Sequence, residues 1–266
     1  MLRDITLGQY YQTDSLIHRL DPRVKLAGTL LYIISLFFFQ NVVAYLIAIL
    51  FLAIVIRLSH VPFRYMVKGM KAIVFLLLIT VAFNLFLTPG EVLVSIWKLN
   101  ITKEGLFTAG TMAVRLIILI IGSSVMTLTT TPNQLTDGME KGMRPLKVFH
   151  VPVHEISMMM SIALRFIPIL LEETDKIMKA QIARGADFES GNIIQRAKAM
   201  IPILVPLFVS AFRRATDLAM AMEARCYRGG EGRTKMKPLK YAKRDHMVYG
   251  AYLVYFVVAI LLKVVL

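Results

Sequence analysis

Acidic side chains and cysteine are scarce in this 266-residue sequence, and one long stretch carries no charge at all. The 17 Asp and Glu are outnumbered by 31 Lys and Arg, which gives a formal net charge of +14. The single cysteine, Cys226, excludes an internal disulfide framework. The chain is instead rich in apolar surface, with 57% hydrophobic residues and a mean hydropathy of +0.64. A water-soluble core cannot bury that much apolar surface, so a lipid bilayer must cover part of it.

Motifs for nucleotide hydrolysis and metal binding are absent from the sequence. No G-x-x-x-x-G-K-[ST] phosphate loop occurs, and the glycine-rich stretch 229–232 does not match one, so we expect this chain not to bind ATP. His154-Glu155 lacks the second histidine of a zinc-protease helix. Lysines one turn away favour a solvated charged face over a metal cluster for three acidic residues, Glu172, Glu173 and Asp175. We expect neither a catalytic residue nor a metal or cofactor site on this chain.

The basic excess has two interpretations. A pI near 10.0 is typical of nucleic-acid-binding proteins. Here, however, the basic residues flank or follow apolar spans, and no basic platform interleaved with aromatic residues occurs. This distribution is typical of cytoplasmic loops that face anionic headgroups or acidic partners. We therefore expect a lipid bilayer, and no nucleic acid, as a partner.

The apolar stretches predict five transmembrane helices. Residues 26–56 form a run of 31 uncharged residues, longer than the ~20 that one helix needs to cross a bilayer. Basic residues precede and follow this run, so the positive-inside rule places both of its ends in the cytoplasm. We expect two short spans that meet near Gln40 and Asn41. Three further spans are predicted at 72–88, 105–128 and 247–262.

A basic segment separates the last two spans. Residues 130–246 contain 19 Lys and Arg against 12 Asp and Glu, which predicts a cytoplasmic location. The expected protein is all-α and multi-pass, with four transmembrane helices in residues 1–129, a cytoplasmic domain at 130–246 and a last span in 247–266. A cytoplasmic N-terminus and five crossings leave the C-terminus outside.

The fourth span carries one charge, Arg115. An arginine inside a bilayer is costly and usually faces protein or water. Its position, one-third of the way along the span, also allows the side chain to reach the outer interface. Both interpretations stay open.

Two long amphipathic helices are predicted in the cytoplasmic segment. Mostly apolar residues recur there at steps of four and three, which is the spacing of one helix face. They are Met160, Leu164, Ile167, Leu171, Thr174 and Met178 in the first helix, and Leu204, Phe208, Ala211, Ala215, Leu218 and Met222 in the second. Pro168, Pro202 and Pro206 predict kinks or breaks. Ten of the 16 methionines lie in this segment, and they fit either an adaptable partner surface or ordinary helix packing.

Each amphipathic helix ends in a similar arginine motif. Ala183-Arg184-Gly185 closes the first helix and Ala224-Arg225-Cys226 closes the second. A cation near a helix C-terminus complements the helix dipole, and a glycine can take the left-handed conformation after the last turn. Arginine also presents a fork of donors that can pair with a carboxylate of a partner. The recurrence of the motif indicates an internal repeat with two similar helix ends.

The block 152–188 resembles one family strongly. The matching runs are Pro152-Val153-His154-Glu155, Ser161-Ile162-Ala163-Leu164-Arg165-Phe166-Ile167-Pro168 and Ala180-Gln181-Ile182-Ala183-Arg184-Gly185-Ala186, with His18-Arg19-Leu20-Asp21-Pro22-Arg23 and Thr129-Thr130-Thr131-Pro132 in support. They are similar to the transmembrane T component of energy-coupling factor transporters, which are bacterial ABC importers for vitamins and trace metal ions. The resemblance runs from about Ile17 to the end of the chain.

This resemblance implies a non-catalytic scaffold in the bacterial cell membrane. A T component joins two cytosolic ATPase subunits, which bind ATP and Mg²⁺, to a membrane-embedded substrate-binding subunit, the S component. By match, the residues that dock on the ATPases are Ala183, Arg184, Gly185, Ala224, Arg225 and Cys226. The residues expected to contact the S component are Met158, Met159, Met160, Leu164, Ile167, Leu171, Leu204, Phe208, Leu218 and Met222. The substrate is not named by this sequence, because the S component determines specificity in the family.

The second motif departs from the family, since Cys226 stands where a glycine is usual. Two alternatives follow for the end of the second helix. Either the cysteine itself adopts the left-handed turn, or Gly229-Gly230 ends the helix instead.

Two other functions are open on the residues alone. A membrane-embedded enzyme, such as a lipid-phosphate transferase, would need clustered acidic residues at the end of a span, and none occur. A self-contained channel or secondary transporter would need polar residues at the membrane midplane or paired broken helices. Only Asn84 and Arg115 are candidates for such residues.

The predicted topology can be tested by labelling single cysteines from outside the cell. In a Cys226→Ser background, Gln40→Cys, Lys98→Cys and Lys263→Cys should each react with an impermeant thiol reagent, because all three lie on the outer side in a five-crossing arrangement. Protection of the positions at 98 and 263 would overturn the crossing count.

Overall fold

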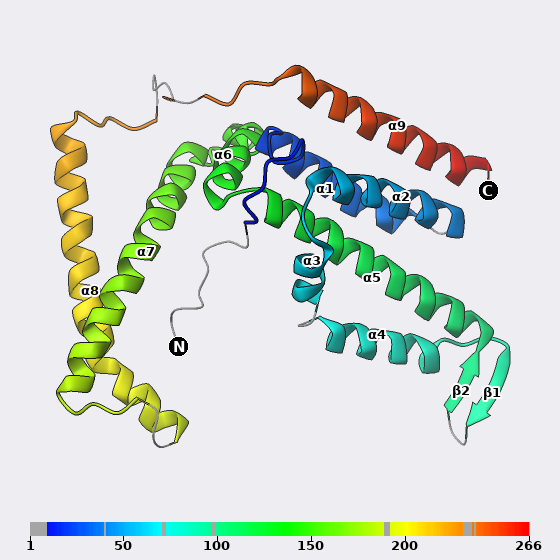
Figure 1. The fold of residues 1–266 in the computed structure, drawn as a ribbon, viewed down its shortest axis with the longest axis horizontal. Helices are drawn as coiled ribbons and strands as arrows, with labels where there is room; N and C mark the ends of the chain where they lie inside the picture. Colours follow the sequence, from blue (N-terminus) through cyan, green and yellow to red (C-terminus); the bar gives the residue numbers. More distant parts are fainter. Residues whose placement is uncertain are drawn as a thin grey trace. The chain divides into compact units, whose positions relative to one another are not determined.

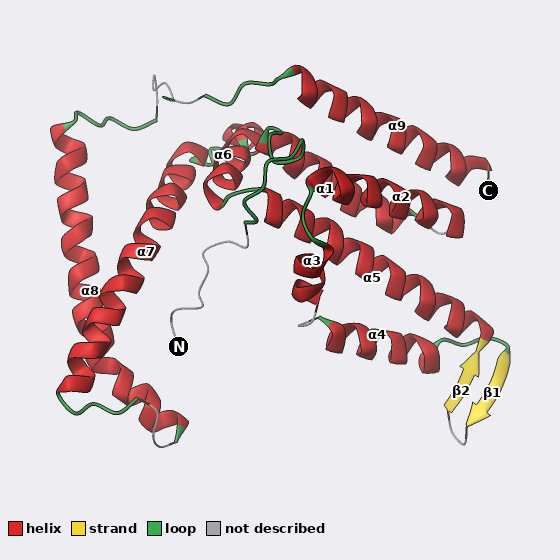
Figure 2. Cartoon of the chain, viewed as in Figure 1, coloured by secondary structure: helices red, strands yellow, loops and turns green. Residues whose placement is uncertain are grey.

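The computed structural model describes residues 10–39, 41–70, 73–96, 99–188, 192–230, 236 and 238–265. Most of these residues are helical, as Figures 1 and 2 show, and the predicted all-α membrane protein is confirmed. A short antiparallel hairpin, which the sequence did not lead us to expect, precedes one of the long helices. The chain forms two compact units: the membrane unit, residues 8–141 and 239–266, and the inserted unit, residues 142–238.

The predicted division of residues 26–56 into two helices is confirmed, since one helix ends and the next begins on either side of Asn41. Gln40 and Lys98, two of the positions proposed for labelling, lie outside the described residues. The elements of the membrane unit are α1 (Pro22–Phe38), α2 (Val42–Ser59), α3 (Phe63–Met70), α4 (Val74–Leu87), β1 (Val92–Ile96), β2 (Leu99–Thr102), α5 (Lys103–Thr129), α6 (Pro132–Gly142) and α9 (Lys243–Val265).

Five helices among the described residues are long and apolar enough to cross a membrane: α2, α5, α9, α7 (Val153–Ala183) and α8 (Ile193–Ala224). The number agrees with our prediction, but two members differ. α1 has 17 residues and α4 has 14, about 25 and 21 Å of helix, which is short for a hydrocarbon core of ~30 Å. α7 and α8 contain seven and six charged residues, whereas α2 contains one. That density of charge is typical of an amphipathic surface helix. The cytoplasmic placement of α7 and α8 stays a prediction.

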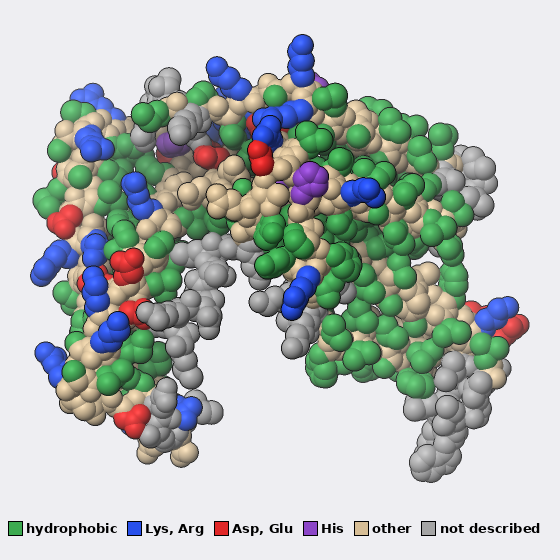
Figure 3. Space-filling model, in the orientation of Figure 1, with side chains coloured by type: hydrophobic (Ala, Val, Ile, Leu, Met, Phe, Trp, Pro, Cys, Tyr) green, Lys and Arg blue, Asp and Glu red, His purple; other side chains and the backbone are tan. Residues whose placement is uncertain are grey.

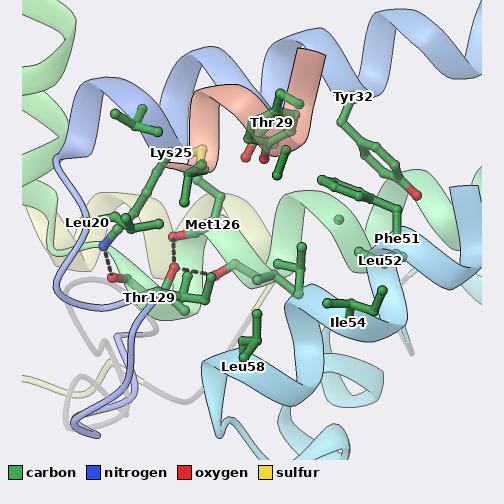
Figure 4. Close-up of a pocket in the computed structure, with 18 residues that line it drawn as sticks. Leu20, Lys25, Thr29, Tyr32, Phe51, Leu52, Ile54, Leu58, Met126 and Thr129 are labelled. Atoms are coloured by element: carbon green, nitrogen blue, oxygen red, sulfur yellow. Dashed lines mark hydrogen bonds between the residues drawn. The ribbon is translucent and has the colours of Figure 1, made fainter. Parts of the chain in front are cut away.

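The core of the membrane unit lies where α1, α2, α5 and α9 pack together. Tyr32 of α1 is 3% exposed, and its ring lies 5.9 Å from the rings of both Phe51 and Tyr255. A mainly apolar cavity of about 150 Å³ remains between these helices, with Lys25 and Thr129 at one end (Figure 4). Aromatic packing therefore holds the middle of the unit, and the Tyr32 hydroxyl donates a buried hydrogen bond to the Ala48 carbonyl there over 3.0 Å.

Two cations join α1 and α5 at opposite ends of their antiparallel contact. Lys25 of α1 donates from Nζ to the carbonyl of Thr129, the last residue of α5, over 2.8 Å. Arg115 of α5 donates from Nη2 to the carbonyl of Phe39, the C-cap of α1, over 3.3 Å, and from Nε to the Tyr45 hydroxyl over 2.8 Å. The last carbonyls of a helix have no partner within it, and an unpaired carbonyl is costly in a bilayer. Each helix thus satisfies the C-terminal backbone of the other, and Arg115 faces protein.

Replacing Arg115 should destabilise the membrane unit. Arg115→Met removes the donors to the Phe39 carbonyl and the Tyr45 hydroxyl, and the loss of hydrogen bonds from a charged group typically costs ~2 kcal/mol. We expect a lower midpoint in thermal unfolding of the purified protein in detergent. Arg115→Lys, which keeps a cation, should fall between this variant and the wild type. An unchanged midpoint for Arg115→Met would show that these contacts contribute nothing.

Candidate functional site

The inserted unit is built on α7 and α8, which pack against each other in opposite directions (Figure 1). A 3₁₀ turn at Arg144–Phe149 precedes α7. At the contact, Glu173 of α7 accepts hydrogen bonds from Ser210 over 2.7 Å and from Arg214 over 2.6 Å, both on α8. The predicted solvated face is therefore wrong for Glu173. The sequence held a signal for this role, because Glu173 alone among the three acidic residues of that group lacks a lysine four positions later.

Prolines lie inside these helices without ending them. Pro206 has no N–H, so the carbonyl of Pro202, four residues earlier in α8, has no donor within its own helix. Gln181 of α7 donates a long hydrogen bond to that carbonyl from Nε2, over 3.5 Å. Pro206 thus leaves a carbonyl that the neighbouring helix binds. α8 continues through both prolines, so the predicted alternative of a helix break does not occur there.

α7 ends at Ala183 in a Schellman turn. Gly185 has a φ of +89°, and its N–H donates to the carbonyl of Ile182 over 2.9 Å. The following N–H donates to the carbonyl five residues back over 3.0 Å. This turn places Arg184 at the C-cap, at the negative end of the helix dipole.

α8 ends in the same turn, although a cysteine replaces the glycine. Cys226 has a φ of +54°, and its N–H donates to the carbonyl of Glu223 over 2.8 Å, while the next N–H donates five residues back over 3.0 Å. The helix ends at Ala224, and Arg225 takes the C-cap position. Of the two alternatives for this helix end, the left-handed turn at Cys226 is the one adopted, and Gly229 lies beyond it.

The two motifs form separate, accessible helix ends. Their six residues are all exposed: Ala183, Arg184, Gly185, Ala224, Arg225 and Cys226. Neither guanidinium forms a hydrogen bond or ion pair with another residue that the structure describes. Gln181, near the end of α7, lies beside Pro202 of α8. Pro202 is about 23 residues before Arg225 along α8, so at ~1.5 Å per residue the two helix ends are ~35 Å apart. The structure does not bring the two arginines together into one site.

The residues predicted to contact an S component differ in exposure. Four are 46% to 62% exposed: Met159, Met160, Leu204 and Phe208. The other six are half-buried: Met158, Leu164, Ile167, Leu171, Leu218 and Met222. Leu218 and Met222 line a groove of about 290 Å³ between α7 and α8.

The sequence is similar to a known family along most of its length. Residues 13–236 match the family CbiQ, described as cobalt transport protein. The chain is 55% identical over 266 residues to the energy-coupling factor transporter transmembrane protein EcfT of Clostridium kluyveri, which covers 99% of this chain and 98% of that protein. Proteins of the same name from Ruminiclostridium cellulolyticum and Bacillus subtilis are 52% and 47% identical, over 100% and 93% of this chain and 99% and 94% of theirs.

Replacing the cysteine of the second motif by glycine should be nearly silent. Cys226→Gly removes a side chain from the left-handed conformation, which costs a non-glycine residue ~1 kcal/mol, so the free energy of unfolding should rise by no more than that amount. Thermal unfolding and transport by the assembled complex measure the effect. Gly185→Cys is the matched control and should lower the stability by a similar amount. A large fall in transport by Cys226→Gly, with normal assembly, would contradict a purely conformational role for this residue.

Proposed function

This chain belongs to the CbiQ family and is the transmembrane component of an energy-coupling factor transporter, and we propose that it couples two cytosolic ATPase subunits to an S component. In this proposal the ATPases bind ATP and Mg²⁺, and this chain contributes no catalytic residue. The S component binds the transported vitamin or trace metal ion. The movement that follows ATP hydrolysis passes through α7 and α8.

The observation that carries this proposal is the pair of matched helix ends. Arg184 and Arg225 occupy the same C-cap position in the same backbone turn, and neither is used within the described part of the chain. An arginine so placed can give its planar fork of donors to a carboxylate of another protein. A separation of ~35 Å, from the helical rise, is too large for one small groove and fits two ATPase subunits, one for each end.

The apolar surface of α7 and α8 supports the second half of the proposal. Met159, Met160, Leu204 and Phe208 leave large apolar side chains uncovered. On the face drawn in Figure 3, Lys and Arg side chains are frequent over α7 and α8, whereas the surface over α2 and α5 is mostly hydrophobic. A helix pair that is apolar on one side and charged on another can lie at the cytoplasmic interface of the membrane and face a hydrophobic subunit.

The two candidate residues of a transport path do not favour a self-contained channel. Asn84 donates to the Thr80 carbonyl of its own helix over 2.8 Å. Arg115 is occupied by Phe39 and Tyr45, as described above. The two polar residues that a transport path would have used are thus engaged in the backbone and packing of the helices.

The two arginines provide the test. Arg184→Ala or Arg225→Ala removes one side of a charged contact. Such a loss typically costs ~2–5 kcal/mol, and we expect a similar cost at the two helix ends. Each single variant should slow uptake more than it lowers the yield of complex, because the other end still holds an ATPase. The double variant should lose the ATPases or hydrolyse ATP without transport. Uptake of labelled vitamins and Co²⁺ into proteoliposomes is measured beside the ATPase rate and the ATPase recovered on a tag on this chain.

Lysine substitutions serve as the matched controls. Arg184→Lys and Arg225→Lys keep the charge but not the planar fork, so they should restore transport only in part. Normal transport by the double alanine variant would mean that these arginines are helix caps only, and the proposed coupling role would be wrong.

A further inference from the structure

The charge-rich run at the start of α1, residues 18–25, plays no part in the function proposed above. Three of the charged side chains near it are almost fully buried: Asp21, Lys25 and Asp245 are 7%, 6% and 1% exposed. A charge buried that deeply is destabilising unless hydrogen bonds or an ion pair satisfy it. The partners of these three groups therefore show what the cluster holds in place.

Asp245 binds two backbone N–H groups from opposite ends of the sequence. Its Oδ1 accepts from the Asp21 N–H over 3.0 Å, and its Oδ2 accepts from the Ala242 N–H over 2.7 Å. Asp245 lies in the first turn of α9, where the N-terminal N–H groups lack helical partners. The same carboxylate thus fixes the start of α9 and ties it to the start of α1.

Lys25 holds the end of α5. Its Nζ donates to the Thr129 carbonyl over 2.8 Å and to the His18 carbonyl over 3.1 Å, and Figure 4 shows the side chain reaching Thr129. A cation at this place also complements the negative end of the α5 dipole. α6 packs on the same turn of α1, since a methyl group at Gly138 would lie 3.1 Å from the Cβ of Pro22.

Asp21 and Arg23 complete the cluster. The Arg23 guanidinium donates to both carboxylate oxygens of Asp21, over 2.9 and 2.7 Å, and its Cζ lies 3.9 Å from the centre of the Tyr241 ring. Burial by itself raises the pKa of Asp21, but the hydrogen bonds from Arg23 together with the charges of Arg23 and Lys25 hold that pKa below its ordinary value. Asp21 is therefore ionised at neutral pH and remains paired with Arg23.

All of these contacts meet at the two places where the chain leaves the membrane unit and returns to it. Residues 130–141 lead out to the inserted unit after Thr129, and residues 239–242 lead back before α9. We infer that Asp21, Lys25 and Asp245 are positioning residues, which hold both attachment points of the inserted unit against α1. The inference rests on the proposed coupling function, and it gives that function its connection to the transmembrane helices.

These residues matter for coupling because a movement of one unit is transmitted to another only if the connections between them are rigid. If the ends of α5 and α9 could separate from α1, a displacement of α7 and α8 would be absorbed in the connecting segments. Lys25 and Asp245 prevent this by bonding to backbone atoms at the end of α5 and the start of α9. Loss of either contact should leave ATP hydrolysis running. Less of the displacement of α7 and α8 should then be transmitted to the substrate-binding subunit.

The experiment measures substrate imported per ATP hydrolysed in proteoliposomes that contain the whole complex from its native host. Labelled riboflavin, folate and Co²⁺ serve as probes, and the wild-type complex shows which of them is used. Lys25→Met keeps an unbranched side chain that is one atom shorter and removes the donor. We expect import per ATP to fall about tenfold, as for the loss of the charged hydrogen bond to the Thr129 carbonyl, with the ATPase rate largely kept. Lys25→Arg, which keeps a cation with donors, should recover most of the loss.

Arg115→Met is the matched control, because it removes a similar cation–carbonyl contact at the other end of the same two helices. It should lower thermal stability as Lys25→Met does, but leave import per ATP unchanged. Equal losses of coupling in the two variants would show a general effect of instability and would overturn the inference. Normal coupling in Lys25→Met would overturn it as well.

Asp245→Asn decides the matter if Lys25→Met does not assemble. The amide keeps one acceptor oxygen and loses the other, so the variant should assemble and show a smaller fall in import per ATP. Full coupling in this variant would contradict the inference. Failure here is distinct from failure of the proposed function, since normal transport by the Arg184→Ala/Arg225→Ala variant would refute coupling through the helix ends whatever Lys25 does.

Discussion

A helix that ends inside or beside a bilayer leaves carbonyl groups without donors, and two buried cations supply those donors in the membrane unit. Lys25 of α1 binds the last carbonyl of α5, and Arg115 of α5 binds the C-cap carbonyl of α1. Both contacts form in a single antiparallel register of α1 and α5. Lys25 and Phe39 are as many residues apart as Arg115 and Thr129. The aromatic core around Tyr32 then packs between two fixed ends. α2 and α9 contribute to the same core.

The inserted unit obtains its repeated geometry from the backbone rather than from one residue type. Gly185 and Cys226 differ in side chain, yet both take a left-handed φ and both close the same pair of hydrogen bonds. The glycine is favoured at such a position because it has no Cβ. The cysteine is accommodated because the two backbone hydrogen bonds of the turn form around it, and its side chain is exposed. The arginine therefore reaches the same cap position on both helices.

Hydropathy and spacing predicted the helices well, and contacts between distant residues poorly. α2, α5, α7, α8 and α9 all have long periodic or apolar signals, and the two arginine motifs could be located from repetition alone. The hairpin β1–β2 was missed because its strands are only five and four residues long. Asp21 and Asp245 are 224 positions apart, so no local sequence pattern joins them. Asp245 lies in the first turn of α9, where an acidic residue is common and gives no sign of a distant partner. Glu173 was misjudged because its partners lie on another helix.

The prolines of α7 and α8 have a mechanical consequence. Each one removes a backbone hydrogen bond from its helix, so bending stiffness is lowest at Pro168 and along Pro202 to Pro206. At the second place the vacant carbonyl is bound by Gln181, three residues before Arg184. Gln181 therefore links the part of α8 that bends most easily to the last turn of α7. Bending of α8 at these prolines would therefore alter a contact that lies close to one of the two arginine helix ends.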